Sequence, residues 1–161
     1  MNKDINKLSA QLGAALLSKS AIVTTAESCT GGGVAQAITD IAGSSKWFHC
    51  GYITYANHAK HKTLGVSAEL LAAQGAVCES VVIEMARGAA REAQANYAIA
   101  ISGVAGPTGG SSNKPVGTVW FACLGPQGVT TVKHQLAGDR NAVREQSVQI
   151  SLQQLLHQVT E

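Results

Sequence analysis

A serine inside a glycine-rich turn is the first residue of this sequence whose setting indicates chemistry. Ser28 stands in Glu-Ser-Cys-Thr-Gly-Gly-Gly, residues 27–33, between a short β-branched run and a helical pattern. Its hydroxyl, the Thr30 hydroxyl and free amides at the start of the coming helix would form a pocket for an anion or an oxyanion, aided by the helix dipole. The alternative is that Thr30 only caps the helix and the glycines only fit a tight turn. Spacing alone leaves both interpretations open.

A serine hydroxyl attacks weakly unless a base takes its proton. The G-x-S-x-G pattern of a nucleophile elbow is absent, and no histidine with a following carboxylate indicates a Ser-His-Asp triad. The alternative base is a lysine made neutral by burial or by a nearby cation, and Lys60 and Lys62 follow Tyr55 at the end of a predicted strand. Both lysines could equally be exposed. We expect Cys29 to be a packed thiol, because neighbouring residues after a strand point to opposite sides.

A second glycine-rich segment and one arginine are candidate ligand contacts. Residues 103–110, Gly-Val-Ala-Gly-Pro-Thr-Gly-Gly, offer close backbone approach and unencumbered amides, which suit a phosphate or a developing oxyanion. They could equally form a structural connection that needs unusual backbone angles. Arg140 opens the last predicted helix and could hold a phosphate through two hydrogen bonds. The alternative is that Asp139 caps this helix and Arg140 is solvated.

The cysteines and histidines give little support to metal or disulfide chemistry. The four cysteines form no C-x-x-C pair, so reduced thiols are the simplest interpretation. His58 and His61 could share a helix face near Cys50, but no second group of ligands completes a zinc site. A solvated helix face is the more ordinary interpretation of the two histidines.

Strand and helix patterns that alternate along the chain must position these residues. Apolar spacing predicts helices after residue 33, from residue 139 onward, and over residues 4–19, 56–64, 68–74 and 80–96. Strands are predicted over residues 21–26, 48–55, 97–102, 116–124 and 129–136, the last two joined by a hairpin turn. This order predicts a three-layer α/β/α sandwich with a mixed β-sheet. If the strands before the two glycine-rich segments are parallel neighbours, both segments lie at the carboxyl ends, where open α/β sheets bind ligands.

Length and composition indicate one globular domain over residues 1–161. The 161 residues are 45% hydrophobic and 14% charged, which is far from the composition of disordered chains. Twelve basic against ten acidic residues leave a formal charge of +2, which argues against a nucleic-acid binder that works mainly through charge. We find no signal peptide and no apolar run long enough for a membrane span, and we therefore expect a cytoplasmic protein.

Five segments together resemble the CinA carboxy-terminal domain family, in its order and spacing and over nearly the whole chain. The segments are residues 24–32 (TTAESCTGG), 51–60 (GYITYANHAK), 101–110 (ISGVAGPTGG), 114–120 (KPVGTVW) and 138–140 (GDR). The match to the stand-alone amidohydrolase members of this family is close. The resemblance implies a three-layer α/β/α fold, a homodimer or larger assembly, and no metal or organic cofactor. The activity that it implies is hydrolysis of nicotinamide mononucleotide to nicotinate mononucleotide and ammonia, in pyridine-nucleotide recycling.

The resemblance also assigns roles to residues. It makes Ser28 the nucleophile, Lys60 its base, and Tyr55 a residue that orients Lys60 or shares in proton transfer. Two departures stand between Tyr55 and Lys60, because a serine and a glutamate frequent in the family are Ala56 and His58 here. The lost carboxylate could change the working pH. The expected substrate contacts are Thr30, Gly31, Gly32, Ser102, Gly103, Ala105, Gly106 and Arg140.

Two other functions fit the same sequence. The glycine-rich pockets could serve an inactive nucleotide-binding or sensor module, and ammonia release from nicotinamide mononucleotide would separate this module from an enzyme. A partner of the DNA-uptake machinery has less support, because the near-neutral chain has no basic aromatic stripe for nucleic acid.

Overall fold

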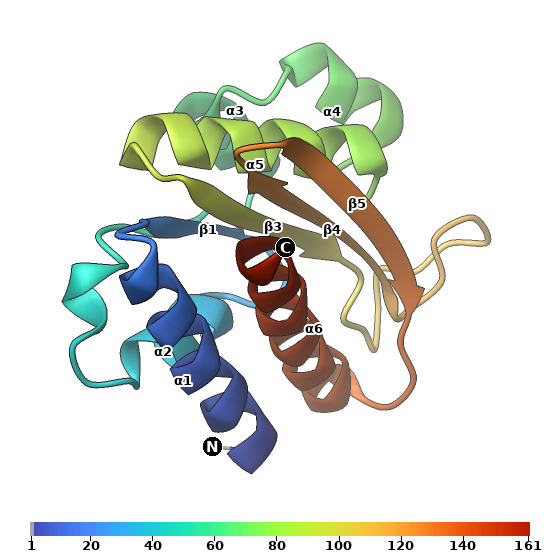
Figure 1. The fold of residues 1–161 in the computed structure, drawn as a ribbon. Helices are drawn as coiled ribbons and strands as arrows, with labels where there is room; N and C mark the ends of the chain where they lie inside the picture. Colours follow the sequence, from blue (N-terminus) through green and yellow to red (C-terminus); the bar gives the residue numbers. More distant parts are fainter. Residues whose placement is uncertain (1) are drawn as a thin grey trace.

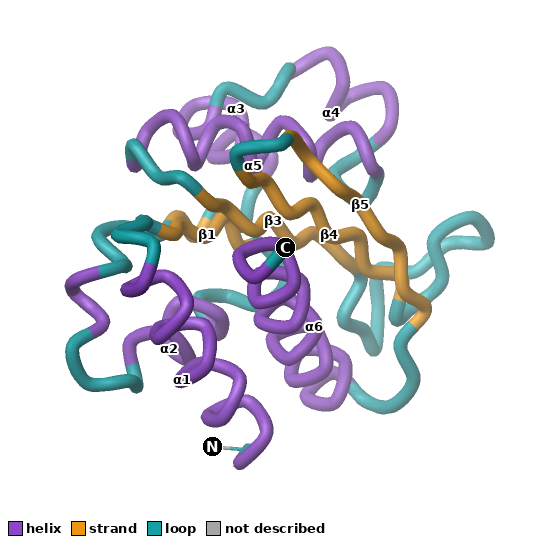
Figure 2. The backbone as a smooth tube through the Cα atoms, in the orientation of Figure 1, coloured by secondary structure: helices purple, strands orange, loops and turns teal. Residues whose placement is uncertain are grey.

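The computed structural model describes residues 2–161, and strands and helices alternate along them (Figures 1 and 2). The helices are α1 (Lys3–Ser18), α2 (Gly33–Thr39), α3 (Asn57–Leu64), α4 (Ala68–Gln74), α5 (Glu79–Ala93) and α6 (Arg140–Thr160), with a short 3-10 helix, η1 (Ser44–Lys46). The strands are β1 (Val23–Glu27), β2 (Tyr52–Ile53), β3 (Tyr97–Gly103), β4 (Thr118–Gly125) and β5 (Gly128–Gln135).

The five strands form one mixed sheet in the order β2-β1-β3-β4-β5. β1 runs parallel to both β2 and β3, whereas β4 and β5 are antiparallel to their neighbours. Glu27, the last residue of β1, pairs with Ile101 of β3. The carboxyl ends of β1 and β3 therefore lie at the same edge of the sheet, and the two glycine-rich segments leave it side by side, as predicted.

Helices cover both faces of the sheet, which confirms the predicted three-layer α/β/α sandwich. α1, α2 and α6 lie on one face, and α3, α4 and α5 lie on the other (Figure 1). β3 shows how the strand pattern divides the core: Ile99 and Ile101 pack with the first group of helices, and Ala98 and Ala100 pack beneath α5. The small alanines bring α5 close to the sheet.

Close packing also fixes α3, the helix that carries Lys60, against α5. A Cβ atom at Gly88 of α5 would lie 2.0 Å from the Leu64 carbonyl oxygen at the end of α3. Any larger residue at position 88 would push the two helices apart. Gly88 therefore sets the depth at which Lys60 enters the molecule.

The strand predicted over residues 48–55 is much shorter in the structure. Only Tyr52 and Ile53 pair with β1 as a ladder, and Phe48 makes a single bridge to Val23. Between these two contacts, the Thr24 hydroxyl donates a hydrogen bond of 2.7 Å to the Cys50 carbonyl oxygen. A side-chain hydrogen bond therefore replaces backbone pairing there. The apolar and aromatic pattern of this segment reflects packing rather than a continuous strand.

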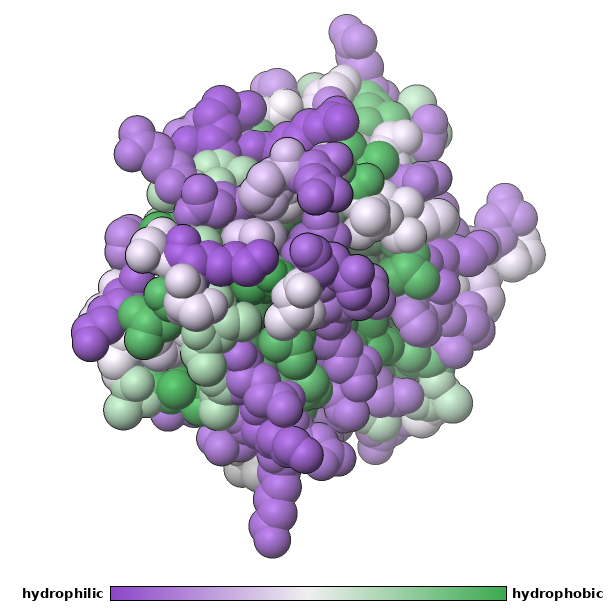
Figure 3. Space-filling model, viewed as in Figure 1, coloured by the Kyte–Doolittle hydropathy of each residue, from purple (hydrophilic) through white to green (hydrophobic). Residues whose placement is uncertain are grey.

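The face seen in Figure 1 is mostly hydrophilic, with hydrophobic side chains in small separate patches (Figure 3). Among the residues that the structure describes, Leu17, Ile53 and Tyr55 are the exposed large hydrophobic residues. No helix within residues 2–161 combines the length and the apolar character that a membrane crossing requires.

Candidate active site

Ser28 lies at the carboxyl edge of the sheet, directly after β1. Its backbone amide extends the ladder to β3 by donating to the Ile101 carbonyl at 3.0 Å, and its carbonyl accepts the Gly31 amide at 3.0 Å. The chain then turns through Gly31 and Gly32, whose φ angles of 58° and 98° are in the left-handed region that favours glycine. These bonds hold the Ser28 backbone, and the side chain is only 8% exposed.

Lys60 reaches Ser28 from α3, on the α5 side of the sheet. Its Nζ lies 3.0 Å from Ser28 Oγ, 2.7 Å from the Thr54 carbonyl oxygen and 3.0 Å from the Tyr55 carbonyl oxygen. A neutral amine has two N–H bonds and one lone pair. When the two carbonyls accept the two N–H bonds, the lone pair is left facing the Ser28 hydroxyl. Lys62, the other candidate base, is exposed on the same helix.

Burial makes the neutral form of Lys60 accessible near neutral pH. The side chain is 1% exposed, and this desolvation lowers the pKa of Lys60 from 10.5 to about 8. The ion pairs among residues 2–161, Arg91–Glu92 and His157–Glu161, leave Lys60 without a carboxylate partner. With this pKa about a tenth of the molecules carry a neutral amine at pH 7, against fewer than about one in a thousand at the ordinary value.

Glu27, rather than Thr30, satisfies the start of α2. The Glu27 carboxylate is fully buried and accepts the Thr30 hydroxyl at 2.8 Å, the Val34 amide at 2.9 Å and the Ala35 amide at 3.0 Å. The interpretation of Thr30 as the helix cap was therefore wrong, and its hydroxyl is a donor to Glu27. The expected free amides at the helix start are also largely occupied, because those of Gly31 and Gly33 close turns.

One cavity of about 310 Å³ opens at the Ser28–Lys60 pair, and most of the predicted site residues meet there. Its lining includes Ser28, Lys60, Tyr55, Ser102, Gly103, Ala105, Gly106 and Arg140. Thr30, Gly31 and Gly32 do not line this cavity, because their turn folds back toward α6. Ala76 and Val77, from the turn between α4 and α5, form part of the wall, and the sequence patterns did not single them out.

Tyr55 and Arg140 meet at the mouth of the cavity. Arg140 donates through Nη1 to the Gly106 carbonyl at 2.7 Å and through Nη2 to the Tyr55 hydroxyl at 3.1 Å. Tyr55 contacts Lys60 through its backbone carbonyl, whereas its phenol bonds to Arg140. Asp139 caps α6 by accepting the Ala142 amide at 2.9 Å, so the capping prediction holds, and Arg140 also faces the site.

Arg144 is a contact of the nucleophile turn that sequence reasoning missed. It donates through Nε to the Cys29 carbonyl at 3.1 Å and through Nη2 to the Thr30 carbonyl at 3.3 Å. The one signal in the sequence is its spacing four residues after Arg140, which places both arginines on one face of α6. Cys29 itself is buried, and this burial raises the pKa of its thiol to about 11, as befits a packed cysteine.

The histidines of α3 lie apart from this cavity. His58 and His61 line a separate hollow between α3 and α4, and the Nδ1 of His61 is bonded to the Val66 carbonyl at 2.8 Å. Within residues 2–161, no group of three or more His, Cys, Asp or Glu side chains is arranged to hold a metal ion.

The fold and the site together define an α/β protein with a buried serine–lysine pair beside an open cavity. The family model described as the CinA C-terminal domain matches residues 5–159, and the chain belongs to this family. The resemblance found in the sequence motifs is thereby confirmed.

Proteins of similar length are among the relatives of this chain. It is 54% identical to the nicotinamide-nucleotide amidohydrolase PncC of Escherichia coli (strain K12), over 98% of this chain and 96% of the relative. The PncC of Pseudomonas putida is 51% identical over 98% of both chains.

Solved structures agree with this fold. A competence/damage inducible protein, CihA, from Agrobacterium tumefaciens superposes with a TM-score of 0.97 at 38% identity, over 100% of this chain and 98% of that one. A CinA superfamily protein from Klebsiella pneumoniae 700603 gives a TM-score of 0.93 at 38% identity, over 99% of both chains.

Proposed function

We propose that this chain is a nicotinamide-nucleotide amidohydrolase that converts nicotinamide mononucleotide to nicotinate mononucleotide and ammonia. The observation that carries the proposal is the contact of 3.0 Å between the buried Lys60 amine and the Ser28 hydroxyl, at the end of a cavity. The names of two full-length relatives at 54% and 51% identity supply the substrate class.

Ser28 and Lys60 account for the first half of the reaction. Neutral Lys60 accepts the Ser28 proton as Ser28 Oγ forms a bond to the carboxamide carbon, and the carbonyl oxygen becomes an oxyanion. Lys60 then returns the proton to the amide nitrogen as the carbon–nitrogen bond breaks. Ammonia leaves, and the substrate remains as an ester on Ser28.

Water completes the reaction at the same pair. Lys60 accepts a proton from a water molecule whose oxygen attacks the ester carbon. The bond to Ser28 Oγ breaks, Ser28 regains a proton from Lys60, and the carboxylic acid product ionises. Each turnover thus consumes one amide and one water and releases ammonia, a carboxylate and a proton, with no redox step.

The remaining cavity residues hold the nucleotide in this proposal. Arg140 is the cation at the mouth and contacts the phosphate, while backbone groups of residues 102–106 line the path to Ser28. Tyr55 orients Lys60 through its carbonyl. We further propose that the chain acts as one domain in a cytoplasmic homo-oligomer, in pyridine-nucleotide recycling, without a cofactor.

Ammonia release by purified protein tests the proposal. Wild-type protein mixed with nicotinamide mononucleotide should release ammonia and nicotinate mononucleotide in equal amounts. Ser28→Ala should lose at least about 10³-fold in kcat, because the nucleophile is gone, and should keep the wild-type melting temperature. Ser18→Ala, an exposed serine on α1, is the control that should change neither. Wild-type protein that binds the nucleotide and releases no ammonia would instead be the inactive sensor.

A further inference from the structure

Arg144 supports the nucleophile turn from the side of the sheet opposite to Lys60. It belongs to α6, on the α1–α2–α6 face, whereas Lys60 comes from α3 on the other face (Figure 1). Its guanidinium donates to the carbonyls of Cys29 and Thr30, the two residues that follow Ser28. Neither ion pair within residues 2–161 includes Arg144, and its guanidinium bonds to these two carbonyls instead.

The two hydrogen bonds fix the orientation of the backbone that follows Ser28. The only cis peptide bond in residues 2–161 is Gly106–Pro107, so the Cys29–Thr30 peptide is trans. In a trans peptide the C=O and the following N–H point in opposite directions. Because the Cys29 carbonyl points toward Arg144 on α6, the Thr30 N–H points away from Arg144, and this peptide cannot rotate without breaking the bond to Arg144.

The backbone amides of this turn make few other hydrogen bonds. The Ser28 amide donates to Ile101, the Gly31 amide to Ser28 and the Gly33 amide to Thr30, whereas no backbone acceptor for the amides of Cys29, Thr30 and Gly32 occurs within residues 2–161. The two bonds from Arg144 are therefore a large part of what holds Cys29 and Thr30 in place. Thr30 is 1% exposed.

Gly31 leaves the space that Arg144 needs. A Cβ atom at position 31 would lie 3.2 Å from Arg144 Nη2, and the φ angle of Gly31 is +58°. The glycine therefore serves both the turn and the guanidinium beneath it. A side chain at position 31 would displace the Arg144 guanidinium by a few tenths of an ångström, and the left-handed φ angle disfavours it as well.

We propose that Arg144 is a positioning residue for the hydrolysis, which holds the backbone of Cys29 and Thr30 and thereby fixes Ser28 in the cavity opposite Lys60. This inference rests on the proposed function. Arg144 does not touch the substrate and acts through the Cys29–Thr30 peptide. A nucleophile that is held in its reactive geometry speeds the chemical step rather than the binding of substrate, so the effect belongs in kcat.

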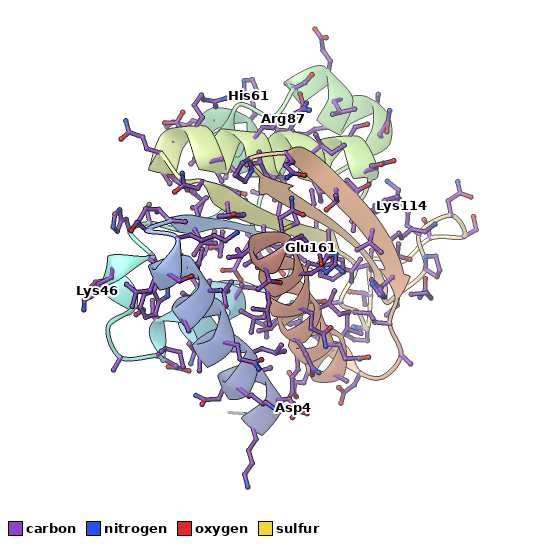
Figure 4. All side chains as sticks on the ribbon, in the orientation of Figure 1. Asp4, Lys46, His61, Arg87, Lys114 and Glu161 are labelled. Atoms are coloured by element: carbon purple, nitrogen blue, oxygen red, sulfur yellow. The ribbon has the colours of Figure 1, made fainter. Side chains whose placement is uncertain are left out.

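The substitution Arg144→Met tests this role by removing both hydrogen bonds while keeping a long side chain. We expect kcat for nicotinamide mononucleotide to fall by about 10²-fold, the usual effect of misplacing a reacting group by about 1 Å, with KM within about threefold of wild type. Arg144→Lys keeps the charge and one donor and should recover part of kcat. Arg87→Met is the matched control, since Arg87 is exposed on α5 across the sheet from α6 (Figure 4) and should retain wild-type kcat.

The outcomes separate this inference from the proposed function. No ammonia release by wild-type protein would overturn the proposed function itself. Active wild-type protein together with full kcat in Arg144→Met would overturn the role of Arg144 alone. A raised KM with unchanged kcat would also overturn it, because Arg144 would then be a substrate contact. If Arg144→Met fails to fold, the same readouts in Arg144→Lys decide, with a lowered kcat at wild-type KM and melting temperature supporting the inference.

Discussion

The two glycine-rich loops end neighbouring parallel strands and look alike in the sequence, but the molecule holds them differently. Residues 27–33 are held by two charged side chains: the Glu27 carboxylate accepts amides at the start of α2, and Arg144 donates to two carbonyls of the loop. Residues 107–110 are exposed, and the loop that contains them is held at Gly106 by Arg140. Lys114, farther along the same loop (Figure 4), makes a second attachment by donating a hydrogen bond through Nζ to the Gln74 carbonyl at the end of α4.

This difference indicates a division of work between the loops. A nucleophile must be held in one geometry, and buried hydrogen bonds to charged groups provide that rigidity. A ligand must enter and leave, and a loop with an exposed tip and a solvent-accessible arginine permits this movement. Substitutions of the side chains that hold the first loop in place should therefore affect catalysis and stability together, whereas those at the second loop should affect substrate binding.

The substitution that should change stability and kcat most, and so test the difference between the two loops most strongly, is at Glu27. Glu27→Gln replaces one acceptor oxygen by an NH₂ group. This group then faces a hydroxyl or amide donor and cannot accept its hydrogen bond. Buried donors left without an acceptor cost about 1–3 kcal/mol, so we expect a loss of about 3 kcal/mol in the free energy of unfolding. The Ser28 turn should also loosen, with kcat reduced by at least about tenfold. Denaturant unfolding and ammonia-release kinetics measure the two quantities.

Glu69→Gln is the matched control for this substitution. Glu69 is an exposed carboxylate in the first turn of α4, so the same chemical change should alter stability by no more than about 0.5 kcal/mol. If Glu27→Gln behaves like the control, the first loop does not depend on its buried carboxylate, and the contrast between the two loops fails.

A smaller effect, on binding alone, is expected at the second loop. Arg140→Met removes the bonds to Gly106 and Tyr55 and the cation at the cavity mouth. We expect KM for nicotinamide mononucleotide to rise on the order of tenfold, the loss of one charge-assisted contact, with kcat within about threefold of wild type. The melting temperature should hardly change, because Arg140 is exposed. A fall in kcat at constant KM would place Arg140 at the reacting centre instead.

The sequence allowed most of the framework to be predicted, because the signals for it are local. The Ala68–Gln74 helix, the hairpin of β4 and β5 and the two loops at the carboxyl ends of β1 and β3 follow from apolar spacing and turn residues. The predicted strand over residues 48–55 failed because its aromatic residues pack without continuous pairing. Periodicity reports which side chains are buried and does not report backbone hydrogen bonds.

The details that give the site its chemistry were not accessible from spacing. In the sequence Glu27 is one residue of a motif. Its carboxylate accepts the amides of Val34 and Ala35 only because the folded chain brings the start of α2 back to it. Arg144 bonds to a carbonyl 115 residues away in sequence, so no local pattern could pair it with the Ser28 turn. The burial of Lys60 depends on how closely α3 packs on α5, which is a property of the assembled layers.

The pH dependence of kcat/KM for nicotinamide mononucleotide tests the central claim most directly, because the claim requires a neutral Lys60. Lys60 has a pKa lowered to about 8, so its neutral fraction grows as pH rises toward that value and saturates above it. We predict that kcat/KM climbs about tenfold per pH unit below pH 8 and levels off above it. Lys62→Arg should reproduce this curve, while Lys60→Arg should be inactive throughout, since a guanidinium stays charged. A flat profile for wild-type protein, or substantial turnover by Lys60→Arg, would contradict the account.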